Sequence, residues 1–260
     1  MHPFLNIFGH FVPLYGLMIA IGILISGNIA YQTAKRRGID ADGLTALVGY
    51  SIFGGFIGAK ILYLATEYHE LDLSRLLDPT YRLSLINSSG FVVMGGLATG
   101  ALCGYIASKI HHLDVGKMLQ NTIFALPLAQ GFGRIGCFFA GCCYGVHYDG
   151  FLSVTFPEGS FPGSVPRLPI QLISALALFA LSLGLYLISR TVYKKYLIAA
   201  YIGGYAFLRF IIEFFRGDEM RGIAAGISLS QYLSLGAVGV MLVYVGIKQW
   251  RIKRLQLRNL

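Results

Sequence analysis

The sequence predicts an all-α polytopic membrane protein with seven transmembrane helices and a small external head. Of the 260 residues, 55% are hydrophobic and only 13% are charged, whereas a soluble domain of this length needs more charge to cover its surface. The apolar residues form long continuous runs, which favour helices over the short alternating segments of a membrane β-barrel. We interpret residues 1–260 as a single membrane domain.

Seven apolar stretches of about 20 residues are each long enough to cross the hydrocarbon layer of a bilayer. The fourth stretch differs from the others because it contains Gln130 and Arg134, and such side chains normally face a bundle interior or a watery cavity. The predicted spans are 14–34, 43–65, 90–110, 118–139, 169–188, 197–216 and 225–247.

Two connections between the spans are long enough to have structure of their own. Residues 66–89 mix charged residues with Leu and Tyr, a pattern that suits an amphipathic segment at the membrane interface. Residues 140–168 are rich in Gly and Pro and contain a short β-like run, Leu152–Phe156. We interpret residues 140–168 as the external head, inserted within the membrane domain.

The positions of Lys and Arg predict that the N-terminus lies outside and the C-terminus inside. This orientation places thirteen of the 21 basic residues on the inner side, with only three acidic residues beside them. Those basic residues are Lys35, Arg36, Arg37, Lys109, Lys117, Arg190, Lys194, Lys195, Lys248, Arg251, Lys253, Arg254 and Arg258. The net charge is +9, but the basic residues lie between apolar runs rather than along one stripe of the surface. We therefore expect no nucleic-acid partner.

Several charged residues lie near the outward ends of the predicted spans. They are Lys60, Arg134, Arg209, Glu213 and Arg216, of which the last three share one helix face. Burying a single charge costs at least about 2.5–3.5 kcal/mol, so four cations with one anion at one depth predict a negatively charged ligand. A phospholipid phosphate fits, because guanidinium donates two parallel hydrogen bonds to it. Snorkelling of Lys60 and Arg216, or a structural Arg209–Glu213 ion pair, would explain the same charges without a ligand.

Three of the four cysteines lie toward the outer side, where thiols can oxidise, whereas Cys103 lies within a span and is expected to pack there. Cys137 could form a disulfide with Cys142 or Cys143, or the three thiols could stay reduced and act in catalysis near an arginine. Inert packing is a further alternative. A zinc site that includes His147 would have the unusual spacing Cys-x4-Cys-Cys-x3-His.

Two motifs resemble the signature of the prolipoprotein diacylglyceryl transferase family. Residues 133–145 read GRIGCFFAGCCYG, and residues 209–216 read RFIIEFFR. Shorter matches follow in the same order along the chain, so that the resemblance covers about residues 14–247. These matches are Tyr15-Gly16-Leu17-Met18, Lys60 in place of the family's usual Arg, Gly95-Gly96-Leu97 and Gln171.

The resemblance implies an enzyme of the cytoplasmic (inner) membrane whose active site faces the outer side. It implies transfer of a diacylglyceryl group from phosphatidylglycerol to a cysteine thiol of a lipoprotein precursor, with no cofactor and no metal. The enzyme must hold the departing glycerol phosphate and help to deprotonate the thiol. The candidate catalytic residues are Arg134, Arg209, Glu213, Cys142 and Cys137. The candidate substrate-binding residues are Tyr15, Lys60, Met94, Gly95, Gly96, Gln171, Gly145 and Arg216.

The sequence departs from the family pattern where the acceptor thiol is handled. Met94 stands where the family has a His, Cys137 replaces an Asn and Cys142 replaces a Glu. Residues 168–174 lack a further His and Glu of the family. The residues expected to hold phosphate are retained, whereas those expected to handle the thiol are changed. Two alternative functions are therefore a non-catalytic protein that binds anionic phospholipid and a cysteine-dependent thiol enzyme on the same fold.

Overall fold

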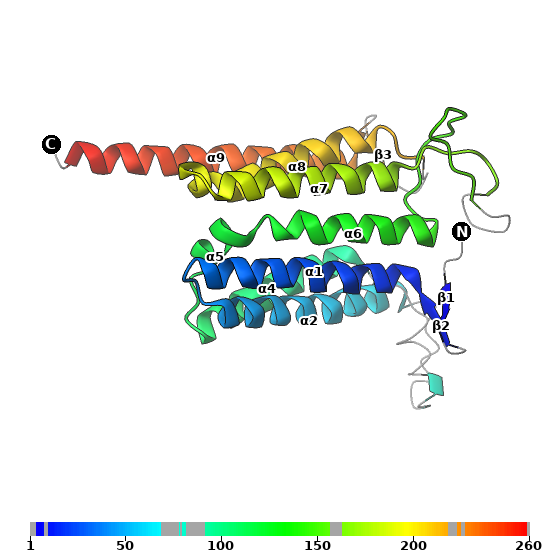
Figure 1. Ribbon diagram of the computed structural model, residues 1–260, viewed down its shortest axis with the longest axis horizontal. Helices are drawn as coiled ribbons and strands as arrows, with labels where there is room; N and C mark the ends of the chain where they lie inside the picture. The colour runs from blue at the N-terminus through cyan, green and yellow to red at the C-terminus, as the bar shows by residue number, and fades with distance from the viewer. Residues whose placement is uncertain are drawn as a thin grey trace. The chain divides into compact units, whose positions relative to one another are not determined.

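The computed structural model of the protein is mainly helical (Figure 1). It describes residues 4–7, 10–68, 78, 80–81, 92–156, 163–217, 223–224 and 227–258. The chain forms two compact units, of which the first consists of Met1–Thr33 with Lys117–Leu260 and the second of Ala34–Gly116.

Within the described residues, five helical stretches are long and apolar enough to cross a membrane. They are α1 (Leu14–Arg36), α2 (Ala41–Thr66), α7 (Ile170–Ser189), the 3-10 helix η3 (Val192–Tyr196) together with α8 (Leu197–Glu213), and the segment Leu229–Ile247 of α9 (Leu229–Arg258). The span predicted at 90–110 corresponds to α4 (Val93–Ile110), and its first residues lie outside the described part. The protein is therefore an all-helical, multi-pass membrane protein.

The span predicted at 118–139 consists of two helices rather than one. Helices α5 (Val115–Thr122) and α6 (Ala125–Ala140) meet at an angle of 62° and supply a sixth crossing if they traverse the bilayer together. Pro127 explains the break, because proline has no N–H to donate to the carbonyl of Ile123 and its ring clashes with that carbonyl. Proline is tolerated in the first turn of a helix, and α6 begins two residues before it.

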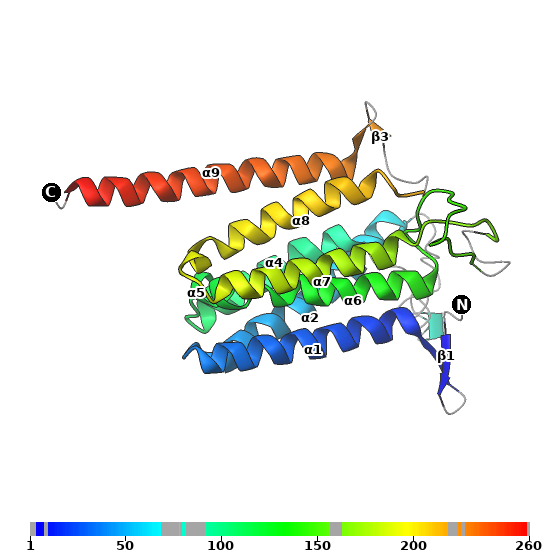
Figure 2. The ribbon, with the colours of Figure 1, turned by 45° about the horizontal axis from the view of Figure 1, so that its top comes forward.

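In the first unit, α6 lies between α1 and α7, followed by α8 and α9 (Figures 1 and 2). Glycines permit the close contacts of α6, because a Cβ atom on Gly131 would overlap the Phe179 ring of α7. A Cβ on Gly136 would lie 3.1 Å from the carbonyl oxygen of Tyr15 in α1. The start of α1, the end of α6, the start of α7 and the end of α8 lie at one end of this unit.

Two short antiparallel hairpins flank helices of this unit, and neither was predicted from the sequence. Strands β1 (Phe4–Ile7) and β2 (His10–Pro13) precede α1. Strands β3 (Ile223–Ala224) and β4 (Ile227–Ser228) precede α9. Four-residue and two-residue strands carry too few residues for a periodic pattern to be recognised in a sequence.

In the second unit, α2 and α4 pack through small residues, as the spacing of Gly54 and Gly58 predicts. A Cβ on Gly54 would overlap Cys103, and a Cβ on Gly58 would overlap Thr99. The Thr99 hydroxyl donates to the carbonyl oxygen of Gly54 at 2.8 Å, which links the two helices. The prediction that Cys103 is a packing residue is confirmed.

The connection after α6 is described for residues 141–156 and 163–168. The β-like run Leu152–Phe156 contributes one isolated bridge, between Val154 and Arg167. Phe156 is 2% exposed and stacks edge-on against Phe138 of α6, which anchors the connection to the helix. The amphipathic segment predicted at 66–89 lies mostly outside the described residues.

Candidate active site

The end of α8 gathers two arginines around one buried carboxylate. Arg209 Nη2 lies 3.0 Å from Glu213 Oε2, and Arg216 Nη1 lies 3.4 Å from the same oxygen. Arg209 and Glu213 share a face of α8 one turn apart, whereas Arg216 follows the helix and is brought back by tight turns at Phe214 and Phe215. The Glu213 side chain is 3% exposed, so this triad is shielded from solvent.

The guanidinium of Arg209 has hydrogen-bonding capacity that the protein leaves unused. Its Nη1 atom is buried and has no hydrogen-bond partner among the described residues. Buried polar groups are nearly always paired, so an unpaired guanidinium nitrogen indicates a missing anionic or polar ligand. Arg209 therefore binds Glu213 with one nitrogen and presents the other to a ligand.

Arg134 of α6 belongs to the same electrostatic cluster. Its positive charge acts on Arg209 and also on Tyr15 and Cys143. This proximity agrees with the prediction that Arg134 and Arg209 belong to one site, which stays a prediction. Three guanidinium groups and one carboxylate give this cluster a formal charge of +2.

The three outer cysteines converge because of the way in which α6 ends. Gly141 adopts a left-handed conformation with φ of 69°, and its N–H bonds to the carbonyls of Cys137 and Phe138. The N–H of Cys142 then bonds to the Cys137 carbonyl at 3.1 Å, which is the pattern of a Schellman motif. This motif folds the residue after the glycine back over the last turn of the helix, so Cys142 lies above Cys137.

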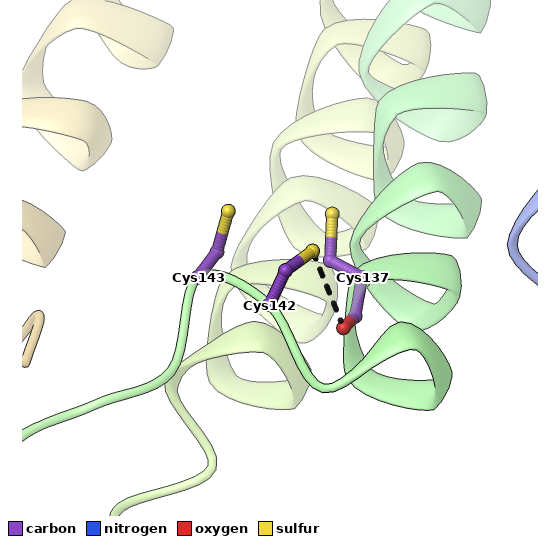
Figure 3. Close-up of side chains that lie close together, drawn as sticks. All are labelled: Cys137, Cys142 and Cys143. Atoms are coloured by element: carbon purple, nitrogen blue, oxygen red, sulfur yellow. Dashed lines mark hydrogen bonds between the residues drawn. The ribbon is translucent and has the colours of Figure 1, made fainter. Parts of the chain in front are cut away.

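The sulfur atoms of Cys137, Cys142 and Cys143 lie within 4.8 Å of one another, and all three cysteines are free (Figure 3). Cys143 has φ of 55°, a left-handed conformation that is uncommon outside glycine. The Cys142 side chain points toward Cys137 and donates to its carbonyl oxygen at 3.7 Å. The structure therefore contains a reduced thiol cluster, and no disulfide joins these residues.

The neighbouring thiols set the protonation of this cluster. Hydrogen bonds from Cys137 and Cys142, together with the charges of Arg216 and Arg134, hold the pKa of Cys143 well below its usual range. Hydrogen bonds with Cys137 and Cys143 raise the pKa of the Cys142 thiol, and burial raises it further. The surroundings of the cluster thus favour ionisation of Cys143 over that of Cys142.

Gln171, at the start of α7, holds the thiol loop in place. Its Nε2 donates to the Cys142 carbonyl at 2.8 Å, and its side chain is buried with 1% exposure. Its Oε1 is buried and has no partner among the described residues. Gln171 therefore positions the loop and retains one acceptor for a ligand.

Gly145 lies between two other segments of the chain. The Val146 N–H bonds to the Phe215 carbonyl, and the Leu168 N–H bonds to the Val146 carbonyl. A Cβ on Gly145 would overlap the Leu168 carbonyl oxygen, so only glycine fits here. The structure thus gives Gly145 a packing role that connects the thiol loop to the arginines after α8.

The remaining candidate residues belong to the second unit. Lys60 of α2 lies 5.7 Å from the centre of the Tyr63 ring, and Met94 of α4 is 51% exposed. Gly95 and Gly96 face α2, where Cβ atoms would lie 2.5 Å from the Gly58 carbonyl oxygen and 3.0 Å from the Gly55 carbonyl oxygen. Close packing against α2 accounts for both glycines.

Two polar pairs of the first unit were missed by the sequence interpretation. Arg167 stacks over the buried Tyr144 ring at 4.4 Å. Gln130 donates to the Tyr201 hydroxyl at 3.0 Å, joining α6 to α8. Gln130 precedes Arg134 by four residues and Tyr201 precedes Arg209 by eight, so both helical spacings were available in the sequence as a signal.

Comparison with known proteins decides the family. The model of the prolipoprotein diacylglyceryl transferase family matches residues 3–247. This chain belongs to the prolipoprotein diacylglyceryl transferase family. A phosphatidylglycerol--prolipoprotein diacylglyceryl transferase of Clostridium tetani is 35% identical over 254 residues, which cover 96% of this chain and 99% of the relative. A second such protein, from Clostridium perfringens, is 33% identical over 244 residues, and these cover 92% of each chain.

The resemblance in the two signature motifs is therefore confirmed, and the transferases share their size as well as their sequence with this chain. The family signature contributes Arg134 and the thiol loop, and the second motif contributes Arg209, Glu213 and Arg216. The structure brings the two motifs together at one end of the first unit. Chemically, the arrangement can bind a phosphate beside a cluster of thiols.

Proposed function

We propose that this transferase moves the diacylglyceryl group of phosphatidylglycerol to the cysteine thiol of a lipoprotein precursor. The observation that carries the proposal is the pair Arg209 and Arg216 around a single carboxylate, with Arg134 near Arg209 and one buried Arg209 nitrogen unpaired among the described residues. The names of the similar proteins specify phosphatidylglycerol as donor and prolipoprotein as acceptor.

The reaction is a displacement at carbon. The acceptor sulfur forms a bond to the terminal glyceryl carbon of the lipid while the bond from that carbon to the phosphate oxygen breaks. Negative charge grows on the departing glycerol phosphate, and fixed positive groups at that position lower the barrier. Arg209 and Arg134 supply these groups, and Glu213 fixes the Arg209 fork without neutralising the cluster.

The membrane arrangement belongs to the same proposal. Seven spans with the N-terminus outside would place the start of α1, the end of α6, the start of α7 and the end of α8 at the outer surface of the cytoplasmic membrane. Tyr15, Arg134, Gln171 and Arg209 lie at those four helix ends. The single membrane domain 1–260 would then carry residues 140–168 as its external head, beside the phosphate site.

Lys60, Met94, Gly95 and Gly96 remain substrate-binding candidates on the family resemblance. Lys60 would offer a positive charge to an anionic headgroup, whereas Gly95 and Gly96 pack against α2. Tyr15 is 43% exposed at the start of α1 and interacts electrostatically with Arg134 and the thiols, which suits a contact with the lipid. Cys137 and Cys142 would act on the acceptor side of the reaction.

The proposal is tested with purified protein, phosphatidylglycerol labelled in its headgroup and a cysteine-containing lipoprotein-precursor peptide. We expect release of labelled glycerol phosphate only with the peptide, and a mass increase of the peptide equal to one diacylglyceryl group. Arg134→Ala should abolish both signals. Arg190→Ala is the matched control, because Arg190 lies beyond the opposite end of α7, over the Tyr186 ring. Tight lipid binding without release would instead support a non-catalytic lipid-binding protein.

A further inference from the structure

The three thiols at the end of α6 have the spacing of a metal site. Zinc–sulfur bonds of about 2.3 Å in a tetrahedral arrangement place the sulfur atoms about 3.8 Å apart. The sulfur atoms of Cys137, Cys142 and Cys143 lie within 4.8 Å of one another, so small rotations of the side chains bring them to that separation. Figure 3 shows that the helix and the loop contribute side chains to the same small volume.

The backbone around these thiols is fixed before any ion arrives. The Schellman motif at Gly141 holds Cys142 above Cys137, and Gln171 binds the Cys142 carbonyl at 2.8 Å. Cys142 is exposed, which provides an entry path for an ion. A site with preset ligands loses little conformational freedom when it binds a metal.

Positive charges lie close to the three sulfur atoms. Arg134 and Arg216 act electrostatically on Cys143, and Arg134 also acts on Cys137. Three thiolates around a divalent ion carry a net charge of −1, which these guanidinium groups stabilise. Thiolates are the ligands that zinc and similar soft ions prefer.

Among the residues that the structure describes, this cluster has three ligands. His147 lies outside it and contacts Asp149 at 3.4 Å. Structural zinc sites have four protein ligands, whereas a site with three leaves a position for water or substrate. The acceptor of the proposed reaction is itself a thiol, the kind of ligand that would complete the set.

We propose that Cys137, Cys142 and Cys143 bind a zinc ion whose fourth position takes the acceptor thiol. This inference rests on the proposed transferase function.

The chemistry balances without an oxidant or a reductant. The acceptor thiol displaces water from zinc and loses its proton to solvent, because a coordinated thiol ionises readily. The zinc-bound sulfur then attacks the terminal glyceryl carbon, and the electron pair of the carbon–oxygen bond leaves with glycerol phosphate. The product thioether is neutral at sulfur and binds zinc weakly, so water can replace it.

The metal site is tested first without turnover. Metal-free protein, purified in detergent with a thiol-free reductant, is titrated with Cd²⁺ and followed by sulfur-to-metal charge-transfer absorption. We expect one ion per chain in the wild type. Cys137→Ser, Cys142→Ser and Cys143→Ser should each weaken binding at least tenfold, whereas Cys103→Ser, in the second unit, should bind as the wild type does.

Binding of labelled phosphatidylglycerol, which depends on the arginines, verifies that each serine variant is folded. Stoichiometric binding that survives all three substitutions would overturn the metal site. So would absence of charge-transfer absorption in folded wild-type protein, or a disulfide that forms in place of the metal complex under the same reductant.

The role of the ion in transfer is tested separately. Removal of zinc by a chelator should slow diacylglyceryl transfer at least 100-fold, and added Zn²⁺ should restore it, while donor binding stays unchanged. Full transfer by metal-free protein would overturn the role of zinc and leave the transferase function intact. If both the metal-free and the zinc-loaded protein fail to bind and to transfer the donor lipid, the transferase function is refuted. The Cd²⁺ titration would still report on the metal site.

Discussion

The packing of α2 with α4 and the packing around α6 use glycine in different ways. Between α2 and α4, glycines bring two apolar helices together, and the Thr99 hydroxyl donates a hydrogen bond across them to the Gly54 carbonyl. Around α6, glycines allow neighbouring helices to approach closely, and the same helix carries the polar residues Gln130, Arg134 and Cys137. A glycine in a matching sequence motif therefore marks close approach in both units, and only its polar neighbours indicate chemistry.

Arg209 gives the strongest test that the polar residues around α6 and α8, unlike the α2–α4 packing, serve the reaction. Arg209→Lys keeps the charge and removes the second nitrogen of the fork, so we expect diacylglyceryl transfer to fall about 100- to 1,000-fold. Lys194→Arg, in η3 at the opposite end of α8 from Arg209, is the control for a change of cation type. The rate of transfer is measured with labelled lipid. A nearly normal rate in Arg209→Lys would show that Arg209 has only a structural role.

Glu213→Gln probes the same cluster from its anionic side. The substitution leaves two buried guanidinium groups without their carboxylate, which should lower the free energy of unfolding by about 3 kcal/mol. Anionic lipid should restore more stability to the variant than to the wild type, because phosphate replaces the lost charge. Thermal unfolding in detergent, with and without phosphatidylglycerol, measures both effects. Equal stabilisation of the two proteins by lipid would contradict a phosphate site at Glu213.

Gly95→Ala probes the packing of α2 with α4. A methyl group placed 2.5 Å from the Gly58 carbonyl oxygen forces α4 away from α2, and we expect a loss of about 1–3 kcal/mol. Gly49→Ala, on α2 with open space around it, should be neutral or stabilising by up to about 1 kcal/mol. A Gly95 variant of normal stability that has lost lipid binding would show that the glycine acts on substrate instead.

Gln171→Met has the smallest expected effect. The change keeps the volume and leaves the Cys142 carbonyl without its donor, at a cost of about 1–2 kcal/mol. If Gln171 only positions the loop, the transfer rate should fall together with Cd²⁺ affinity. An affinity for phosphatidylglycerol that falls while Cd²⁺ binding is unchanged would assign Gln171 to the donor lipid.

Much of this protein follows from the sequence because its causes are local or compositional. Twenty-residue apolar runs must become helices in lipid, since every backbone group needs a partner there. The spacing of Arg209 and Glu213 fixes their contact on one helix. The family motifs name the arginines, and the family assignment is confirmed over residues 3–247.

The structure decided the rest, because it depends on the exact path of the backbone and on contacts between segments far apart in the chain. Pro127 breaks the fourth span, and the turn after α8 brings Arg216 back to the carboxylate of Glu213. The sequence did not decide the role of the outer cysteines, which could form a disulfide, act in catalysis, pack inertly or bind zinc with His147. The left-handed residues Gly141 and Cys143 determine where the thiols meet, and a sequence does not show which residues take that conformation. The sequence by itself determined which charges enter the membrane, whereas only the fold decided which of them, and which thiols, face one another.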